Sequence, residues 1–458
     1  MSSEWRVAKV EEIAAPYSTA LATGPFGSAI SSKYFVDSGV PVIRGSNLSA
    51  DTSTRLIDAD LVFVSHEKAN EFQRSVAKRG DLVFTCWGTI NQVGLIDGRS
   101  KFDSYIVSNK QMKLTINPAK ADHRFIYYVF SGPAKQNEIL ENGIGSSVPG
   151  FNLGQLKRHE ILLPPVQEQI RIADFLETLD DRITLLRETN ATLEAIAQAL
   201  FKSWFVDFDP VRAKAEGRQP EGMDATTAAL FPDSFEESEL GSVPKGWEVL
   251  PLRQLCAFQK GCSYKGDGLA DGEGAYMFNL GCFNEPRVYA FQKVKRYVGD
   301  YKPKHQVNPG DLIIANTDMT QQRDILGRPL LVPSGMEPGF ISHHVFKVEV
   351  GERFGNQIRD FLFFSFQQAV FRERAVGYAT GTTVLALPRD ALEEHCVVLP
   401  SQSLLMAFSD VVSPLLSTIH ENEERATLLT QLRDTLLPRL ISGQLRLPQA
   451  AALIEEAV

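Results

Sequence analysis

The feature that most constrains this chain is an internal repeat. The stretch GSSVPGFNLGQLKRHEILLPPVQEQI at residues 145–170 returns as GTTVLALPRDALEEHCVVLPSQSLLM at 381–406, at a constant offset of 236 residues. FIYYVF and FLFFSF match upstream at the same offset, whereas earlier matches drift to offsets of 230 and 242. A chain that contains one junction twice is predicted to fold into two copies of one structural unit.

A long apolar seam follows each junction. From Ile172 to Trp204 and from Phe408 to Leu440, the seam residues alternate four and three apart, which is heptad spacing. We expect the two helices to pair as an antiparallel coiled coil with pseudo-twofold symmetry, and packing of each helix on its own domain is the alternative. Equal seams place Asn190 opposite Asn422, unless both face solvent. The predicted seam residues are Leu176, Leu179, Ile183, Asn190, Leu193, Leu200, Val412, Leu415, Ile419, Asn422, Leu429 and Leu436.

Short apolar strands separated by turns dominate the segments before each long helix, for example VPVIRG and DLIIAN. This pattern predicts β-rich domains with one or two helices, an α+β fold. Gly, Pro and acidic residues predict a linker between the copies. The expected organisation is a first globular domain at 1–164, a long helix at 165–204, a linker at 205–246, a second globular domain at 247–400, a second long helix at 401–441 and a C-terminal tail at 442–458.

Composition leaves nucleic-acid binding open. The net charge is −9, but the two globular segments are nearly neutral and the acidity lies mainly in residues 161–246. A neutral domain can still gather positive charge on one face. The sequence shows no signal-peptide core and no run of 18 apolar residues, so we expect a cytoplasmic protein that does not span a membrane. Five cysteines without a CxxC pair are expected to be reduced thiols.

The motifs that catalytic chains of this size usually carry are missing. There is no P-loop, and Asn-Pro at 117–118 and 308–309 does not continue into the [DN]PP[YF] tetrad of amino-methyltransferases. His343 and His344 have no carboxylate motif at metal-ligand spacing. PDSFEESE at 232–239 is expected to be a solvated acidic loop. We therefore expect neither a catalytic nor a metal site in this chain.

Several motifs together carry a resemblance that covers nearly the whole chain. They are GPFGS (24–28), VPVIRG (40–45), LLPPVQEQIRIADFL (162–176), LFKSWFVDFDPV (200–211), ELGSVPKGW (239–247), NTDMTQQRDILGRP (316–329) and LLPRLISGQL (436–445). This set resembles the specificity subunits of type I restriction-modification enzymes. The second junction departs from the pattern, because Pro-Ser replaces Pro-Pro and Leu404-Leu405 stands where the first copy has Glu-Gln.

The resemblance implies a non-catalytic subunit that supplies DNA sequence recognition. Each globular part would be a target recognition domain that reads one half of a bipartite, asymmetric site on double-stranded DNA. Two modification subunits would methylate adenine N6 with S-adenosylmethionine, and restriction subunits would use ATP and Mg²⁺. This chain would bind none of these cofactors itself. The alternative is a stand-alone DNA-binding or coiled-coil adaptor protein without a restriction partner.

Polar and cationic loop residues are the candidates for DNA contact, because Lys, Arg and small hydroxyls position phosphates while Arg, Asn and Gln read base edges. Solvated loops or helix caps would use the same residue types. In the first copy the candidates are Ser28, Lys33, Arg44, Asn47, Trp87, Thr89, Asn91, Gln92, Asn109 and Lys110. In the second copy they are Lys260, Ser263, Tyr264, Lys265, Asn316, Thr317, Gln321, Arg323, Thr382 and Thr383.

Overall fold

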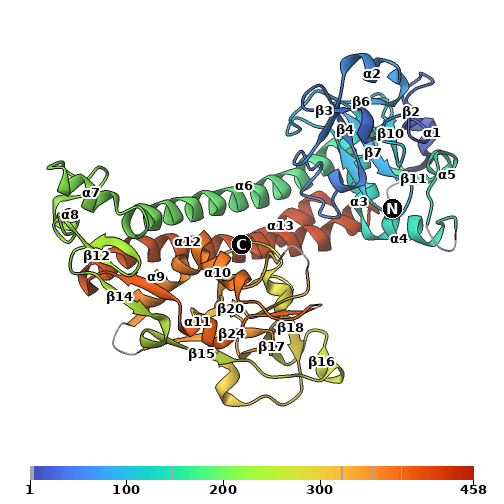
Figure 1. Ribbon diagram of the computed structural model, residues 1–458. Helices are drawn as coiled ribbons and strands as arrows, with labels where there is room; N and C mark the ends of the chain where they lie inside the picture. The colour runs from blue at the N-terminus through green and yellow to red at the C-terminus, as the bar shows by residue number, and fades with distance from the viewer. Residues whose placement is uncertain (1–4, 146–148, 321–322, 352–354, 383, 458) are drawn as a thin grey trace. The chain divides into compact units, whose positions relative to one another are not determined.

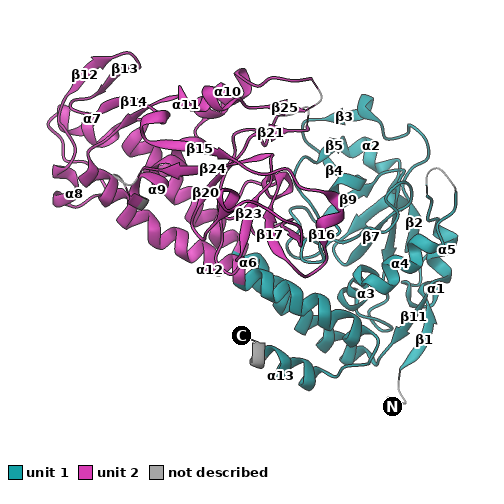
Figure 2. Cartoon of the chain, turned by 90° about the horizontal axis from the view of Figure 1, so that it is seen from below, with its two compact units in different colours: residues 1–186, 425–458 teal, residues 187–424 magenta. Residues whose placement is uncertain are grey.

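The computed structural model describes residues 5–145, 149–320, 323–351, 355–382 and 384–457 (Figure 1). The chain forms two compact units: unit 1 contains residues 1–186 and 425–458, and unit 2 contains residues 187–424 (Figure 2). The boundary crosses both long helices, α6 (Val166–Phe205) and α12 (Gln402–Ile441), so each unit holds about half of each helix. The expected domain boundaries, which kept each long helix whole, differ from this division.

Unit 1 contains three sheets. β1 (Arg6–Lys9) pairs antiparallel with β11 (Glu160–Leu163). A four-stranded sheet has the order β2 (Leu21–Thr23), β10 (Gln111–Thr115), β7 (Asp81–Thr85), β8 (Val93–Leu95). A five-stranded sheet, in which β4 and β9 run parallel, has the order β3 (Phe35–Val36), β5 (Val62–Val64), β4 (Val40–Ile43), β9 (Ser104–Val107), β6 (Val76–Lys78).

Unit 2 repeats the same three sheets in the same order. β14 (Glu248–Pro251) pairs antiparallel with β26 (Cys396–Leu399). The four-stranded sheet has the order β15 (Cys256–Lys260), β24 (Val345–Val350), β20 (Leu312–Ala315), β22 (Pro329–Leu331). The five-stranded sheet, in which β17 and β23 run parallel, has the order β16 (Leu269–Ala270), β18 (Lys295–Tyr297), β17 (Ala275–Phe278), β23 (Gly339–Ile341), β19 (Gln306–Val307). The repeat in the sequence thus corresponds to a repeated mixed fold.

Shorter helices surround the sheets of each unit. In unit 1 they are α1 (Val10–Ile13), α2 (His66–Asn70), α3 (His123–Ser131), α4 (Pro133–Glu141), α5 (Leu153–Arg158) and α13 (Leu447–Ala457). In unit 2 they are α7 (Asp209–Ala215), α8 (Ala225–Ala229), α9 (Gly355–Gln367), α10 (Ala369–Gly377) and α11 (Arg389–Glu393). The Asp122 carboxylate caps α3 by accepting from the backbone N–H groups of Arg124 and Phe125. Residues 125–130 of α3 are all buried, as expected of a helix enclosed on every side.

Within unit 1, the first half of α6 packs against the last half of α12. Leu176 shares one apolar cluster with Leu436, and Ile183 shares another with Leu429. Rising numbers in α6 meet falling numbers in α12, so these halves run antiparallel. A buried ion pair interrupts the apolar seam: Arg433 Nη1 lies 2.8 Å from Asp180 Oδ1, and the two side chains are 3% and 0% exposed. The Tyr128 hydroxyl donates to the second Asp180 oxygen at 2.6 Å.

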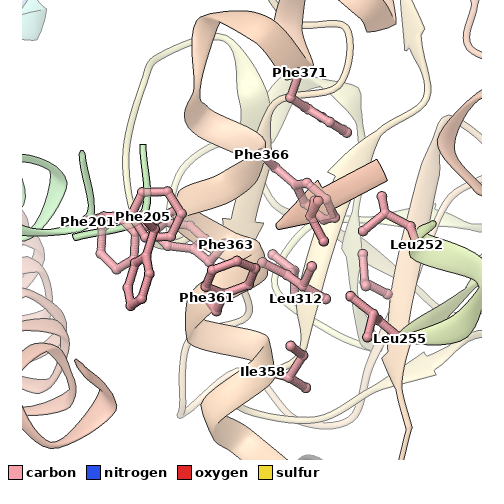
Figure 3. Close-up of a cluster of buried hydrophobic side chains, with 14 of the residues drawn as sticks. Phe201, Phe205, Leu252, Leu255, Leu312, Ile358, Phe361, Phe363, Phe366 and Phe371 are labelled. Atoms are coloured by element: carbon pink, nitrogen blue, oxygen red, sulfur yellow. The ribbon is translucent and has the colours of Figure 1, made fainter. Parts of the chain in front are cut away.

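Within unit 2, the last half of α6 packs against the first half of α12 and against α9. Figure 3 shows Phe201 and Phe205 of α6 approaching Phe361 of α9, with ring centroids 5.5 and 5.3 Å away. Phe205 also lies 5.1 Å from Phe408 of α12. Edge-to-face and tilted aromatic pairs of this kind add to the free energy gained by burial. This aromatic cluster ties the long helices to the sheets of unit 2.

An asparagine pair lies in the seam of unit 2. Asn422 Nδ2 donates to Asn190 Oδ1 at 2.9 Å, and Asn190 Nδ2 donates to the Ile419 carbonyl at 3.1 Å. Both asparagines are 7% exposed, so they face each other inside the helix pair. Of the other predicted seam residues, Leu193, Leu200 and Leu415 are half-buried. Leu176, Leu179, Ile183, Val412, Ile419, Leu429 and Leu436 are buried.

Charged side chains attach each set of sheets to its helix halves. In unit 1, Arg55 reaches Glu177 of α6 at 2.9 Å while it also pairs with Asp97 at 2.8 Å. In unit 2, Arg287 forms two contacts of 2.9 and 3.1 Å with the Glu423 carboxylate of α12. Fork-shaped guanidinium contacts fix orientation as well as distance. Each set of loops is therefore held rigidly on its own part of the helices.

The segment 205–246, expected to be a linker, is folded in the structure. It contains α7, α8 and the hairpin of β12 (Phe235–Ser238) with β13 (Gly241–Pro244). Phe208 and Phe231 belong to the core of unit 2, where Phe231 packs on Trp204 at 5.2 Å. The acidic stretch 232–239 thus lies partly in a hairpin, although its glutamates are exposed. The linker was predicted from the Gly, Pro and acidic residues of the whole segment, and that composition gives no sign of the buried aromatic residues.

Two further expectations concern membranes and thiols. Among the described residues, α12 is long and apolar enough to cross a membrane by length and composition alone, a test that the seam of a packed helix also passes. Val412, Ile419, Leu429 and Leu436 of this helix are buried seam residues. All five cysteines are free, and burial raises the pKa of the Cys86, Cys256 and Cys282 thiols to about 12. Thiols with such a pKa stay protonated and unreactive near neutral pH.

Candidate nucleic-acid interface

Four loops of unit 1 converge where strands of the two larger sheets end. The Ser108 N–H donates to the Ile43 carbonyl at 3.0 Å, which joins the turn after β9 to the loop after β4. The Cys86 N–H donates to the Lys110 carbonyl at 2.7 Å, which adds the loop after β7. The loop after β2 begins at Gly24, where a Cβ atom would lie 1.9 Å from the Ser108 carbonyl oxygen. Only glycine permits so close an approach of two backbones.

These loops enclose an open cavity of about 630 Å³. Six of the predicted contact residues line it, although they come from three separate parts of the sequence: Arg44, Trp87, Thr89, Gln92, Asn109 and Lys110. The remaining lining residues are Ile30, Phe35, Val42, Gly45, Ser46, Leu48, Thr85, Ser108 and Gln111. Two cations and several amides and hydroxyls therefore surround the cavity, and none of the described residues that line it is a carboxylate.

The polar groups of the cavity are held in place by the backbone. The Arg44 guanidinium donates to the Asp60 carbonyl at 3.0 Å, and its buried Nε has no hydrogen-bond partner among the described residues. The Asn109 amide donates to the Gly27 carbonyl at 3.0 Å. The Lys110 and Thr89 side chains are exposed. Cations and amides presented in this way suit an anionic polymer with hydrogen-bonding edges.

The other predicted residues of the first copy lie outside this cavity. Ser28 and Lys33 are exposed and Asn91 is half-buried. Asn47 is 1% exposed, and its amide donates to the Ile57 and Ala59 carbonyls at 3.0 and 3.3 Å. The Asn47 side chain is thus used inside the loop that it holds together, and a contact between Asn47 and DNA stays a prediction.

Unit 2 has the same four loops with different side chains. The register of the parallel strands places Ser342, His343 and His344 where unit 1 has Ser108, Asn109 and Lys110. The Ser342 N–H donates to the Phe278 carbonyl at 2.9 Å, as the Ser108 N–H does to Ile43. A Cβ at Gly261 would lie 2.3 Å from the Ser342 carbonyl oxygen, which repeats the close approach at Gly24.

The predicted residues of the second copy divide into three groups. Lys260, Ser263, Lys265, Arg323 and Thr382 are exposed, and Tyr264 is half-buried with its ring 6.1 Å from His343. Gln321 and Thr383 lie outside the described residues. Asn316 and Thr317 are buried, 2% and 7% exposed, so a contact of either residue with DNA stays a prediction. Asn316 Nδ2 donates to the His343 carbonyl, and Thr317 Oγ1 lies 2.8 Å from His344 Nδ1.

Sequence reasoning missed several residues of the loop clusters. Ser46, Ser108 and Gln111 line the cavity of unit 1. His343 and His344, considered only as metal ligands, occupy the equivalent turn of unit 2. Burial lowers the pKa of both imidazoles, helped at His343 by Lys260 and at His344 by His343, so both rings are neutral at pH 7. A strand-by-strand alignment of the two copies could have found them.

In the part of the chain that the structure describes, no three His, Cys, Asp or Glu side chains gather as metal ligands. The functional groups of the loops are cations, amides, hydroxyls, imidazoles and one exposed indole. Such an arrangement is equipped to bind and discriminate.

Comparison with known proteins finds similar chains and a similar fold. Residues 19–195 match the family model described as the type I restriction modification DNA specificity domain. The HindI specificity subunit of Haemophilus influenzae is 24% identical over 435 residues, covering 81% of this chain and 88% of that one. The MjaIX specificity subunit of Methanocaldococcus jannaschii is 23% identical over 429 residues, covering 88% of each chain.

The chain is thus similar to type I restriction enzyme specificity subunits over most of its length, and the matched DNA specificity domain lies in residues 19–195. A solved S subunit of a type I system from M. genitalium has a TM-score of 0.58 and 14% identity, covering 96% of this chain and 97% of that one. At that identity the likeness concerns the fold alone.

Proposed function

We propose that this chain reads a bipartite, asymmetric site on double-stranded DNA as the recognition subunit of a type I restriction-modification complex. One observation carries the proposal: the two units repeat the same sheets, yet the same turn presents Asn109 and Lys110 in unit 1 and His343 and His344 in unit 2. Equal scaffolds with unequal loops are what two different half-sites require, because base edges are read by individual side chains.

The chemistry of the unit 1 cavity supports this role. Arg44 and Lys110 supply positive charge for phosphates, which carry no sequence information. Asn109 and Gln92 offer amides, which can make paired hydrogen bonds to an adenine edge. In unit 2, the exposed Lys260 and Lys265 are the corresponding phosphate contacts. Each unit thus combines positioning groups with groups that discriminate bases.

The two long helices would mount both recognition domains as an antiparallel coiled coil with pseudo-twofold symmetry. The antiparallel contacts inside each unit, Asp180 with Arg433 and Asn190 with Asn422, support this arrangement. Two modification subunits would dock on the repeated junctions, and restriction subunits would join them. S-adenosylmethionine, ATP and Mg²⁺ would be used by those partners, and the complex would work in the cytoplasm.

Methylome sequencing of cells that express the chain with its modification subunits tests the proposal. We expect N6-methyladenine in one motif made of two short, different half-sites. Joint Asn109→Ala and Lys110→Ala substitution should relax one half-site, and joint Lys260→Ala and Lys265→Ala substitution should weaken methylation dependent on the other. Lys245→Ala, at an exposed lysine away from the loops, is the matched control and should leave the motif unchanged.

Three results would contradict the proposal or favour its alternative. Absence of any methylated motif, or a single undivided motif, would reject bipartite recognition. Methyl transfer by the purified chain without modification subunits would show that the cofactor assignment is wrong. Specific DNA binding that is indifferent to added modification subunits would favour a stand-alone DNA-binding protein.

A further inference from the structure

Trp87 differs from the other tryptophans of the chain because its indole is 52% exposed. Trp204 and Trp247 are 4% and 7% exposed, and Trp5 is partly buried against the core of unit 1. A single exposed apolar side chain needs no special explanation. Trp87, however, lines the cavity of the loop cluster together with Arg44 and Lys110.

The backbone beneath the ring holds Trp87 in this position. Trp87 and Gly150 form a β-bridge, flanked by hydrogen bonds from the Gly88 N–H to the Pro149 carbonyl and from the Phe151 N–H to the Cys86 carbonyl. A Cβ on Gly150 would lie 2.6 to 3.0 Å from three atoms of the six-membered ring. Glycine is thus needed at 150, because the indole rests directly on its backbone.

Unit 2 has neither a tryptophan equivalent to Trp87 nor a glycine equivalent to Gly150. The equivalent bridge in unit 2 joins Thr317 to Ala386, at the same 236-residue offset between Gly150 and Ala386. Thr317 is 7% exposed, so nothing projects from that strand. Ala386 can carry a Cβ because no indole lies over it. Position 150 is glycine because the Trp87 ring lies over its backbone. Trp87 and Gly150 therefore form a paired feature of unit 1 alone.

We propose that the exposed face of Trp87 stacks on one nucleobase of the half-site that unit 1 reads, with Gly150 as the positioning residue. This inference rests on the proposed function and adds the kind of contact. A flat apolar ring fits a base, while Arg44 and Lys110 beside it fit the phosphates on either side. Among the described residues that line the cavity there is no carboxylate to repel the backbone of DNA.

Stacking inside a duplex requires that a base step opens. Side chains that insert between base pairs unstack them, and pyrimidine–purine steps open most easily. The half-site of unit 1 should therefore contain such a step at the Trp87 contact. The half-site of unit 2, read without an exposed ring at Thr317, has no such requirement. The two units would then differ in the kind of contact they make with DNA as well as in the bases they recognise.

Equilibrium binding of the full chain with its modification subunits tests this, using a duplex that carries the motif found by methylome sequencing. Trp87→Ala should weaken binding by about 5- to 150-fold, the range for loss of one base–aromatic stack, and Trp87→Phe should weaken it less. Gly150→Ala should also weaken binding, because the added methyl displaces the ring. Tyr378→Ala is the control: it removes an equally exposed aromatic ring from unit 2 instead of unit 1 and should leave binding unchanged.

A scan of abasic duplexes identifies the partner base. If Trp87 stacks on one base, the difference between the wild-type chain and Trp87→Ala should collapse when that single base is removed and persist at every other position. Tryptophan fluorescence provides a second measurement: DNA should quench the wild-type complex more than the Trp87→Phe complex. Both readouts report on the contact even if Gly150→Ala disturbs the loop.

The outcomes separate this inference from the proposed function. Wild-type affinity in Trp87→Ala, or a loss that is equal on every abasic duplex, would overturn the stacking contact while specific methylation still supports DNA recognition. Failure of the wild-type complex to bind or methylate any specific site would instead reject the proposed function itself.

Discussion

The contribution of the buried ion pair to the stability of unit 1 can be tested quantitatively, because unit 2 shows which side chains fill the equivalent position. Tyr128, Asp180 and Arg433 form a hydrogen-bonded layer in unit 1, with contacts of 2.6 and 2.8 Å. At the 236-residue offset, unit 2 has Phe364, Leu416 and Ala197 in the same layer, all buried in its apolar core. The same packing position is therefore filled by an ion pair in unit 1 and by apolar side chains in unit 2.

Removing one partner of the ion pair should cost far more than replacing the whole layer. Arg433→Ala leaves Asp180, which is 0% exposed, without its cation, and such unpaired buried charges cost about 3–5 kcal/mol. The triple variant Tyr128→Phe, Asp180→Leu and Arg433→Ala copies the layer of unit 2. Apolar replacement of a buried ion pair is often neutral, so the triple variant should unfold within about 1 kcal/mol of the wild type.

The assay must report on unit 1 separately, because a chain with two units need not unfold in one step. Urea unfolding monitored by hydrogen exchange in residues 166–186 of α6 provides this, with 190–205 in unit 2 as an internal control. The reasoning is refuted if the triple variant is as unstable as Arg433→Ala. It is equally refuted if Arg433→Ala costs less than about 1 kcal/mol, since Asp180 would then tolerate burial alone.

Three further outcomes are expected. Asn190→Leu should destabilise unit 2 by about 1–3 kcal/mol by leaving the buried Asn422 amide without its acceptor, and joint Asn190→Leu and Asn422→Leu should restore most of that loss, as urea unfolding would show. Burial, together with Arg374, lowers the pKa of His395 to about 4, whereas an unfolded imidazole titrates near about 6.5. The unfolded state therefore binds the proton first, and the His395 contribution to the stability of unit 2 should be complete above pH 6.5 and be lost as the pH falls towards 4, by at most about 1.4 kcal/mol per pH unit. His395→Gln should flatten that slope, and an unchanged slope would contradict the assignment. One heptad added to both long helices lengthens each by about 10 Å, and methylome sequencing should then find unchanged half-sites separated by a longer gap; an altered half-site with an unaltered gap would reject this.

The local features of the fold follow closely from sequence pattern. The expected long helices at 165–204 and 401–441 compare with Val166–Phe205 and Gln402–Ile441 in the structure. Heptad spacing is itself a property of helix geometry, and the proline-containing junctions limit where each helix can begin. Strands with short apolar runs were recognisable for the same reason. The overall polarity of the segment 205–246 concealed the few aromatic residues that pack in the core.

The candidate interface was only partly accessible to sequence. Residue type and loop position selected Arg44, Trp87 and Lys110, which do line one cavity. The same criteria selected Asn47 and Asn316, which are buried and hold their own loops. The local sequence around a loop asparagine does not show whether its amide faces solvent or bonds to the backbone. Only the packing of neighbouring segments distinguishes the two.

The sequence by itself determined the duplication and the two long helices, because periodic spacing translates directly into geometry along a helix. It left open whether Asn190 and Asn422 face each other or solvent, and the structure places them face to face. Tertiary structure alone decided which loops meet. Strands β4 and β9 are distant in sequence, and their parallel pairing brings the loop of Arg44 to the turn of Lys110. It also decided that an indole rests on Gly150, since that contact depends on a bridge between residues 63 positions apart and leaves no periodic trace in the sequence.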